Sequence, residues 1–234
     1  AFYSISIGLW GNFRQLWLQD NNFSVVDISN IISIGTLISV IGIILVGRYI
    51  KIEKLKIFVT LSLFIKFFNF LFLLKLNNTN HNILISISVI LDVLSGYLII
   101  TSIYPLITTI VKNNTIYSKR KLTEYLFRDI GVLVGGLLIG KNIIGVLVNY
   151  NICLFISTIF LGLSIIIMFD MTACKKIEEK KESNISIIKY ILKNKLQIVY
   201  TIYTFIGSMA FSTALGLKML TFTNYLNFSD SYAT

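Results

Sequence analysis

The sequence predicts an all-α polytopic membrane protein. Of its 234 residues, 55% are hydrophobic and only 14% are Asp, Glu, Lys or Arg, and the mean hydropathy is +0.78. A soluble domain has about 25% charged residues, and at this size it lacks the interior to bury so much apolar surface. The composition also excludes a disordered chain, and two cysteines are too few for a disulfide scaffold.

Seven apolar stretches are long enough, or nearly so, to cross a bilayer, which takes about 20 residues of helix. Ile, Leu, Val and Phe occupy all faces of these stretches, a pattern typical of helices in lipid. The many isoleucines favour strands in water, but in lipid a helix satisfies its own backbone hydrogen bonds. The predicted spans cover residues 2–18, 30–46, 57–74, 83–111, 130–148, 151–169 and 196–223.

The basic residues lie in alternate loops. Sixteen of the 21 fall in segments 47–56, 112–128 and 175–195, whereas the intervening loops hold almost none. Loops rich in Lys and Arg stay in the cytoplasm. This bias predicts a multi-pass protein of the cell membrane, expected to be a bacterial inner membrane, with a cytoplasmic N-terminus. Because the basic clusters interrupt membrane spans, they do not indicate nucleic-acid binding.

The longest hydrophilic stretch follows the sixth span. After its mixed lysines and glutamates, isoleucines recur at helical spacing between 185 and 192, which predicts an amphipathic helix on the inner membrane surface. The triplet Asn22-Phe23-Ser24 recurs as Asn227-Phe228-Ser229, six spans later. A helix that reappears after six spans is expected of a duplicated transporter, so the chain is interpreted as a fragment of a protein with about twelve spans.

The loop after the second span reads Gly47-Arg48-Tyr49-Ile50-Lys51-Ile52-Glu53-Lys54, and Tyr150-Asn151 is expected to turn the fifth span tightly into the sixth. With the short hairpin loops and the long basic loop after span six, these features make the chain resemble the major facilitator superfamily (MFS) over essentially all of its length. The superfamily motif in the loop after span two keeps its bases here but lacks the usual Asp before Arg48.

The resemblance implies an MFS-type six-helix N-terminal bundle at 1–170, a cytoplasmic linker with an amphipathic helix at 171–195, and the first helix of a truncated second bundle at 196–234. It implies a secondary active transporter, with no enzymatic activity and no cofactor, that moves a small solute by alternating access. It also implies a gating role for the loop residues Gly47, Arg48 and Lys51.

Five ionisable residues fall inside predicted spans, where a charge costs at least about 2.5–3.5 kcal/mol and therefore faces a cavity or a partner. Arg14, Lys141 and Lys218 are the candidate substrate-binding residues, and their positive charge predicts an organic anion as substrate. Asp92 is the candidate site for coupling to a proton or counter-ion. The alternatives are a structural ion pair between Asp92 and Lys141 or Arg14, and snorkelling of Arg14 and Lys218 to the outer interface. Lys66, near the centre of its span, is assigned no role.

Glycines recur in the fifth predicted span, at Gly131, Gly135, Gly136, Gly140 and Gly145. Small residues four apart let helices pack closely, and glycine-rich fifth spans also occur in antiporters of the superfamily. Two other functions stay open. One is a multidrug efflux transporter of the same fold, although exporters of cationic drugs generally use buried acids. The other is a seven-helix membrane protein that does not transport.

Overall fold

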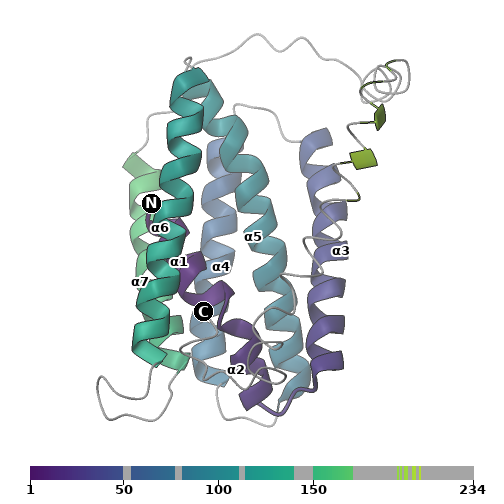
Figure 1. The fold of residues 1–234 in the computed structure, drawn as a ribbon, viewed down its shortest axis with the longest axis vertical. Helices are drawn as coiled ribbons and strands as arrows, with labels where there is room; N and C mark the ends of the chain where they lie inside the picture. The colour runs from purple at the N-terminus through teal and green to yellow at the C-terminus, as the bar shows by residue number, and fades with distance from the viewer. Residues whose placement is uncertain are drawn as a thin grey trace.

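The computed structural model describes residues 1–49, 54–76, 81–110, 114–139 and 150–170, together with a few single residues between Asn194 and Ile206. Every regular element in these ranges is an α-helix, which confirms the predicted all-α class (Figure 1). The helices are α1 (Phe2–Gly11), α2 (Arg14–Asp20), α3 (Val25–Tyr49), α4 (Leu55–Leu76), α5 (Asn82–Ile110), α6 (Asn114–Ile139) and α7 (Tyr150–Asp170).

Four of these helices are long and apolar enough to cross a membrane: α3, α4, α5 and α7. They correspond to the predicted spans 30–46, 57–74, 83–111 and 151–169. Much of their surface is apolar and exposed, most clearly on α3, where Leu37, Ile41 and Ile44 are at least half exposed. Such a surface is stable against lipid rather than water. The chain is therefore a membrane-embedded helical protein.

The first predicted span differs from the structure because it is not one continuous helix. It breaks at Asn12 and Phe13 into α1 and α2, and neither piece alone is long enough to span a bilayer. Gly11 and Asn12 have poor helix propensity, which explains why the backbone hydrogen bonds of the helix are interrupted there. Phe13 is fully buried against Gly135 of α6, and the next residue, Arg14, begins α2.

The segment 112–128, expected to be a cytoplasmic loop, is helical from Asn114 onward. The prediction was wrong because it treated a run of charges as a loop signal. Residues 114–130 contain no glycine or proline and include good helix formers, so a polar helix extends the apolar one. Similarly, Tyr150 and Asn151 form the first turn of α7 rather than a turn between helices.

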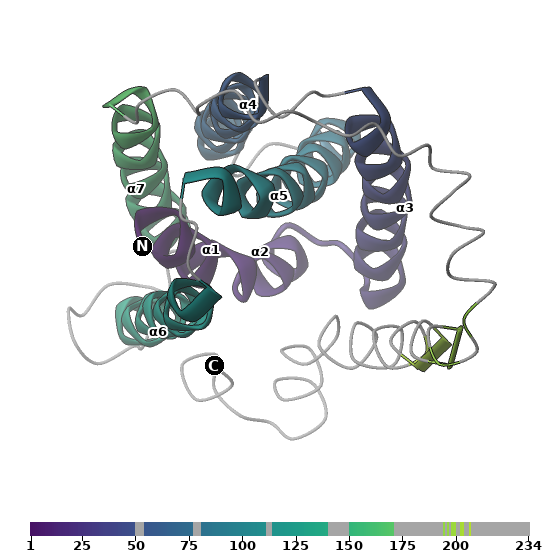
Figure 2. The same ribbon diagram turned by 90° about the horizontal axis from the view of Figure 1, so that it is seen from above.

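The most extensive helix–helix contacts form a symmetric set. Helix α1 packs on α6 and α7, α5 packs on α3 and α4, and α4 packs on α7 (Figure 2). Exchanging α1 with α5, α3 with α6 and α4 with α7 reproduces the five most extensive of these pairings.

Helices α1 and α6 approach each other through glycines. A Cβ atom at Gly8 would lie 2.0 Å from the backbone oxygen of Arg128, and one at Gly131 would lie 2.4 Å from the backbone oxygen of Ile5. At Gly135 a Cβ would lie 2.3 Å from the ring of Phe13. The predicted close packing is therefore confirmed for Gly131 and Gly135, whereas Gly140 and Gly145 lie outside the described residues.

A tight turn joins α2 to α3 and fixes the position of α2. Asn22 adopts a left-handed conformation, with φ at 64°, and the amide of Phe23 donates to the carbonyl of Leu18 at 3.1 Å. The left-handed residue and this hydrogen bond form a Schellman motif, which ends α2. Ser24 and Asp27 then form a reciprocal capping box at the start of α3: the amide of Asp27 donates to Ser24 Oγ, and the amide of Ser24 donates to Asp27 Oδ2, each at 3.2 Å.

Candidate functional site

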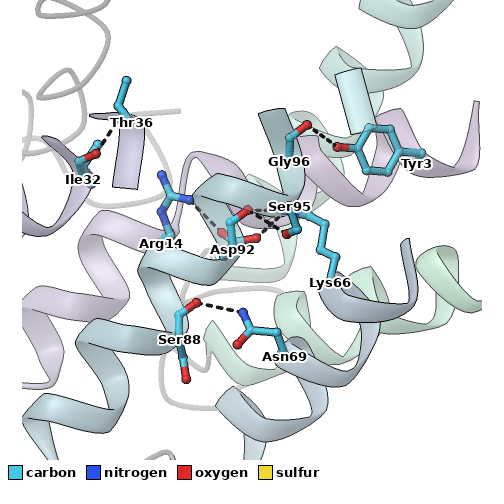
Figure 3. Close-up of polar contacts among 10 residues, drawn as sticks. All are labelled: Tyr3, Arg14, Ile32, Thr36, Lys66, Asn69, Ser88, Asp92, Ser95 and Gly96. Atoms are coloured by element: carbon cyan, nitrogen blue, oxygen red, sulfur yellow. Dashed lines mark hydrogen bonds and ion pairs between the residues drawn. The ribbon is translucent and has the colours of Figure 1, made fainter. Parts of the chain in front are cut away.

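Asp92, in the N-terminal half of α5, binds two basic side chains from two other helices (Figure 3). Arg14 Nη1, on the first residue of α2, lies 2.7 Å from Asp92 Oδ2. Lys66 Nζ, from α4, donates to Asp92 Oδ1 and also to the backbone oxygen of Asp92, the latter at 3.1 Å. The carboxylate is thereby shared between the two cations, one on each oxygen.

This cluster is buried within the bundle. Asp92 and Lys66 have only 2% and 5% of their surface exposed, and the side chain of Arg14 is 15% exposed. Placing charges out of water costs several kcal/mol per ion, which an ion pair offsets only with good geometry and added hydrogen bonds. Two bases and one acid also leave a net positive charge at this site. The cluster is thus a costly arrangement that hydrophobic packing alone does not require.

Neighbouring polar contacts hold α5 in register with the helices around it. Ser95 Oγ donates to the backbone oxygen of Asp92 at 3.0 Å, one of the acceptors that Lys66 also uses. Tyr3 of α1 donates to the backbone oxygen of Gly96 at 3.3 Å. One turn away on the other side, Asn69 Nδ2 of α4 donates to the backbone oxygen of Ser88 at 2.8 Å (Figure 3). These bonds fix the height at which Lys66 meets Asp92.

A cavity of about 180 Å³ adjoins the cluster, and Arg14, Lys66 and Asp92 form part of its wall. Three aromatic residues, Trp10, Phe70 and Tyr97, form another part. The remaining lining residues are aliphatic or glycine: Ile7, Gly11, Val93, Gly96 and Ile100. The break between α1 and α2 lies at this wall, since Gly11 and Arg14 flank it. The cavity therefore combines a charged side with an apolar and aromatic side.

The aromatic side of the cavity is itself well packed. The ring of Trp10 meets that of Trp17 edge-on at 5.5 Å between centroids, and that of Phe70 at 6.0 Å. Lys66 Nζ lies 5.1 Å from the centroid of Phe70, within the range of a cation–π contact. Trp10, Trp17 and Phe70 are almost completely buried. These contacts pack the three rings and Lys66 against one another.

The structure brings together two of the residues singled out from sequence, Arg14 and Asp92, in the ion pair that the sequence left open as the alternative to separate transport roles. Lys66 was missed. Its position near the centre of a span was a signal, because a charge at that depth needs a partner, and Asp92 was an acid within another predicted span.

The other candidate residues cannot be assigned to this cluster. Lys141, Lys218 and Lys51 lie outside the described residues. Helix α3 runs to Tyr49, so the backbone of Gly47 and Arg48 belongs to its last turn rather than to a loop. Within the described ranges, no three His, Cys, Asp or Glu residues are grouped closely enough to hold a metal ion.

Comparison with known proteins gives no family assignment. No protein-family model, curated protein or solved structure matches the chain significantly. The charged cluster and its cavity are therefore the features from which a function can be proposed.

Proposed function

We propose that this protein is a secondary active transporter that moves a small solute across the cell membrane by alternating access. The observation that carries the proposal is the buried cluster of Arg14, Asp92 and Lys66 in the wall of a cavity. Ionisable residues inside a membrane protein are costly, and they commonly mark substrate or ion pathways. The cavity supplies the space that a transported solute needs next to those charges.

The broken first helix supports this function. Transporters typically build substrate and ion sites where a membrane helix is discontinuous, at the interface between structural repeats. Here Arg14, at the break between α1 and α2, pairs with Asp92 of α5. In an MFS-type bundle these two helices would belong to different three-helix units, so the site would lie between the units.

The symmetric packing supports an MFS-type six-helix bundle over residues 1–170. In that superfamily each six-helix half contains two three-helix units in inverted orientation. The pairings of α1 with α6 and α7, and of α5 with α3 and α4, have this pattern. In this proposal, segment 171–195 is the cytoplasmic linker, and 196–234 begins a second bundle that completes the transport pathway.

The charges of the cluster favour an anion as substrate and Asp92 as the coupling residue. With two bases and one acid, the site is net positive, so it does not favour the cationic drugs of the multidrug exporter alternative. A proton or counter-ion that binds to Asp92 would neutralise it and loosen its hold on Arg14 and Lys66. Coupling then follows because the charge state of Asp92 sets the net positive charge that the solute meets.

Reconstitution in proteoliposomes tests this function. We expect gradient-driven uptake of an organic anion from a panel of labelled anions and cations, measured with and without a proton gradient. Arg14→Ala should abolish uptake without loss of folded protein, and Arg14→Lys should retain part of it because the charge remains. Arg128→Gln is the matched control, since that side chain is half exposed and lies over Tyr125, on α6. Normal uptake by Arg14→Ala would remove this cluster from the transport site.

A further inference from the structure

We infer that the cavity binds a monovalent organic carboxylate with an apolar body, held by the free edge of the Arg14 guanidinium. This binding site names the substrate class of the proposed transporter, and it rests on the proposed function only in that the bound molecule is the one transported. Its support lies in three features of the cavity: its charge, its unused hydrogen-bond donors and its apolar wall.

The net charge of the cluster is balanced by a ligand that carries a single negative charge. Asp92 can compensate one of its two cationic partners, so one positive charge remains. Among the described residues, no other carboxylate forms an ion pair with Arg14 or Lys66. A carboxylate ligand would bring the cavity to neutrality. A phosphate monoester carries about −1.5 to −2 at neutral pH and would leave excess negative charge beside Asp92.

The unused donors belong to Arg14. Its guanidinium contacts Asp92 through Nη1 alone, and Nε is buried without a hydrogen-bond partner in the described part of the chain. A buried donor without a partner is costly. The edge formed by Nε and Nη2 has the spacing that binds both oxygens of a carboxylate through parallel hydrogen bonds. Lys66 is less available, because it donates to both the carboxylate and the backbone oxygen of Asp92.

The rest of the wall fits an apolar body. Trp10, Phe70 and Tyr97 contribute ring faces or edges, and Ile7 and Ile100 contribute aliphatic surface. A volume of about 180 Å³ is larger than a carboxylate group alone would fill. Acetate would thus use the charged side only, whereas a carboxylate with an attached ring or short chain would also bury apolar surface. Each buried CH₂ group adds about 0.8 kcal/mol.

Tryptophan fluorescence of the purified protein can report binding directly, because Trp10 lines the cavity and contacts Trp17. The probes are benzoate, its neutral analogue benzamide, the cation benzylammonium, the dianion phenyl phosphate, and acetate. We expect saturable quenching by benzoate, and affinities for the other four probes that are lower by about tenfold or more. The signal that disappears in Trp10→Phe is the part assigned to the cavity.

Variants of Arg14 test which atoms hold the anion. Both Arg14→Gln and Arg14→Lys should weaken benzoate binding about tenfold or more, since Lys keeps the charge but lacks the two-donor edge. Arg128→Gln removes one arginine outside the cavity and should leave the affinity unchanged. Circular dichroism and thermal melting identify any variant that misfolds, and Arg14→Lys then serves as the second, milder test.

Several outcomes would overturn the inference: no saturable benzoate signal, equal affinity for benzamide, tighter binding of phenyl phosphate, or undiminished benzoate affinity in a folded Arg14→Lys. These outcomes are separable from those of the transport assay. Benzoate binding without uptake of any carboxylate would contradict the transport function and leave the binding site standing. Uptake of solutes that are not carboxylates, without benzoate binding, would contradict the carboxylate site and leave the transport function standing.

Discussion

Lys66 of α4 holds Asp92 of α5 at two points, the carboxylate and the backbone oxygen of the same residue. The pair is almost fully buried, and it joins two helices that are packed along their lengths. Arg14 uses the other carboxylate oxygen, so Lys66 stabilises the bundle while Arg14 keeps donors free. Lys66 and Arg14 therefore have different roles, although both pair with Asp92.

Removing Lys66 should destabilise the folded bundle. Lys66→Met leaves Asp92 paired with Arg14 but removes both hydrogen bonds that join α4 to Asp92, and losing hydrogen bonds to a charged group costs about 1.5–3 kcal/mol of unfolding free energy. The double variant Lys66→Met with Asp92→Asn should lose less than the sum of the single variants, by about 1 kcal/mol or more. Denaturation in detergent micelles measures these values.

The control for Lys66 lies on the same helix. Lys75 is exposed in the last turn of α4, so Lys75→Met should change the unfolding free energy by no more than about 0.5 kcal/mol. Equal stability of Lys66→Met and the unmodified protein would show that the ion pair does not hold α4 to α5.

The crossing of α1 and α6 should not tolerate a single methyl group at Gly8. Gly8→Ala places a Cβ 2.0 Å from the backbone oxygen of Arg128, so the helices must separate. We expect a loss of about 1–3 kcal/mol, the usual cost of overpacking, measured as a lower melting temperature. At Gly11 a Cβ would meet only a side-chain atom of Ile7 at 3.6 Å, so Gly11→Ala should not destabilise. Equal melting temperatures for Gly8→Ala and Gly11→Ala would contradict this packing.

The capping box at the start of α3 should contribute measurably to stability. Ser24→Ala removes the acceptor of the Asp27 amide, and losing such a cap costs about 0.5–2 kcal/mol. Hydrogen exchange should become faster in the first turn of α3. Ser86→Ala is the matched control, because Ser86 only donates to the carbonyl of Asn82 within its own helix. Unchanged exchange in Ser24→Ala would mean that the turn after α2 holds α3 without the cap.

Four of the seven predicted spans are found as long apolar helices, because apolar length is a local property. The segments that became α3, α4, α5 and α7 each contain enough consecutive apolar residues to be recognised without their neighbours. The break after Gly11 and the helix over 114–128 were missed for the opposite reason. There the outcome depends on a few residues of low or high helix propensity, whose effects are small beside hydropathy.

The candidate site was predicted in part, and the missing part depends on three-dimensional packing. Arg14 and Asp92 stand out because each is a charge in an apolar span. Their pairing, like the addition of Lys66, depends on which faces of α2, α4 and α5 meet, and residue spacing within one helix does not reveal that. The same holds for Gly8, because a single glycine in an apolar stretch does not indicate that α1 and α6 cross closely at that residue.

The charge bias of the loops predicts an orientation that labelling can test. With basic loops in the cytoplasm, Lys54 before α4 should face inward and His81 before α5 should face outward. In a background with Cys153→Ser and Cys174→Ser, His81→Cys should react with a membrane-impermeant maleimide in intact cells. Lys54→Cys should react only after the cells are lysed. Labelling of Lys54→Cys, but not His81→Cys, in intact cells would reverse the topology. The cavity and the Arg14–Asp92–Lys66 cluster would then keep their place in the bundle, but the side of the membrane that each end of the pathway faces would be exchanged.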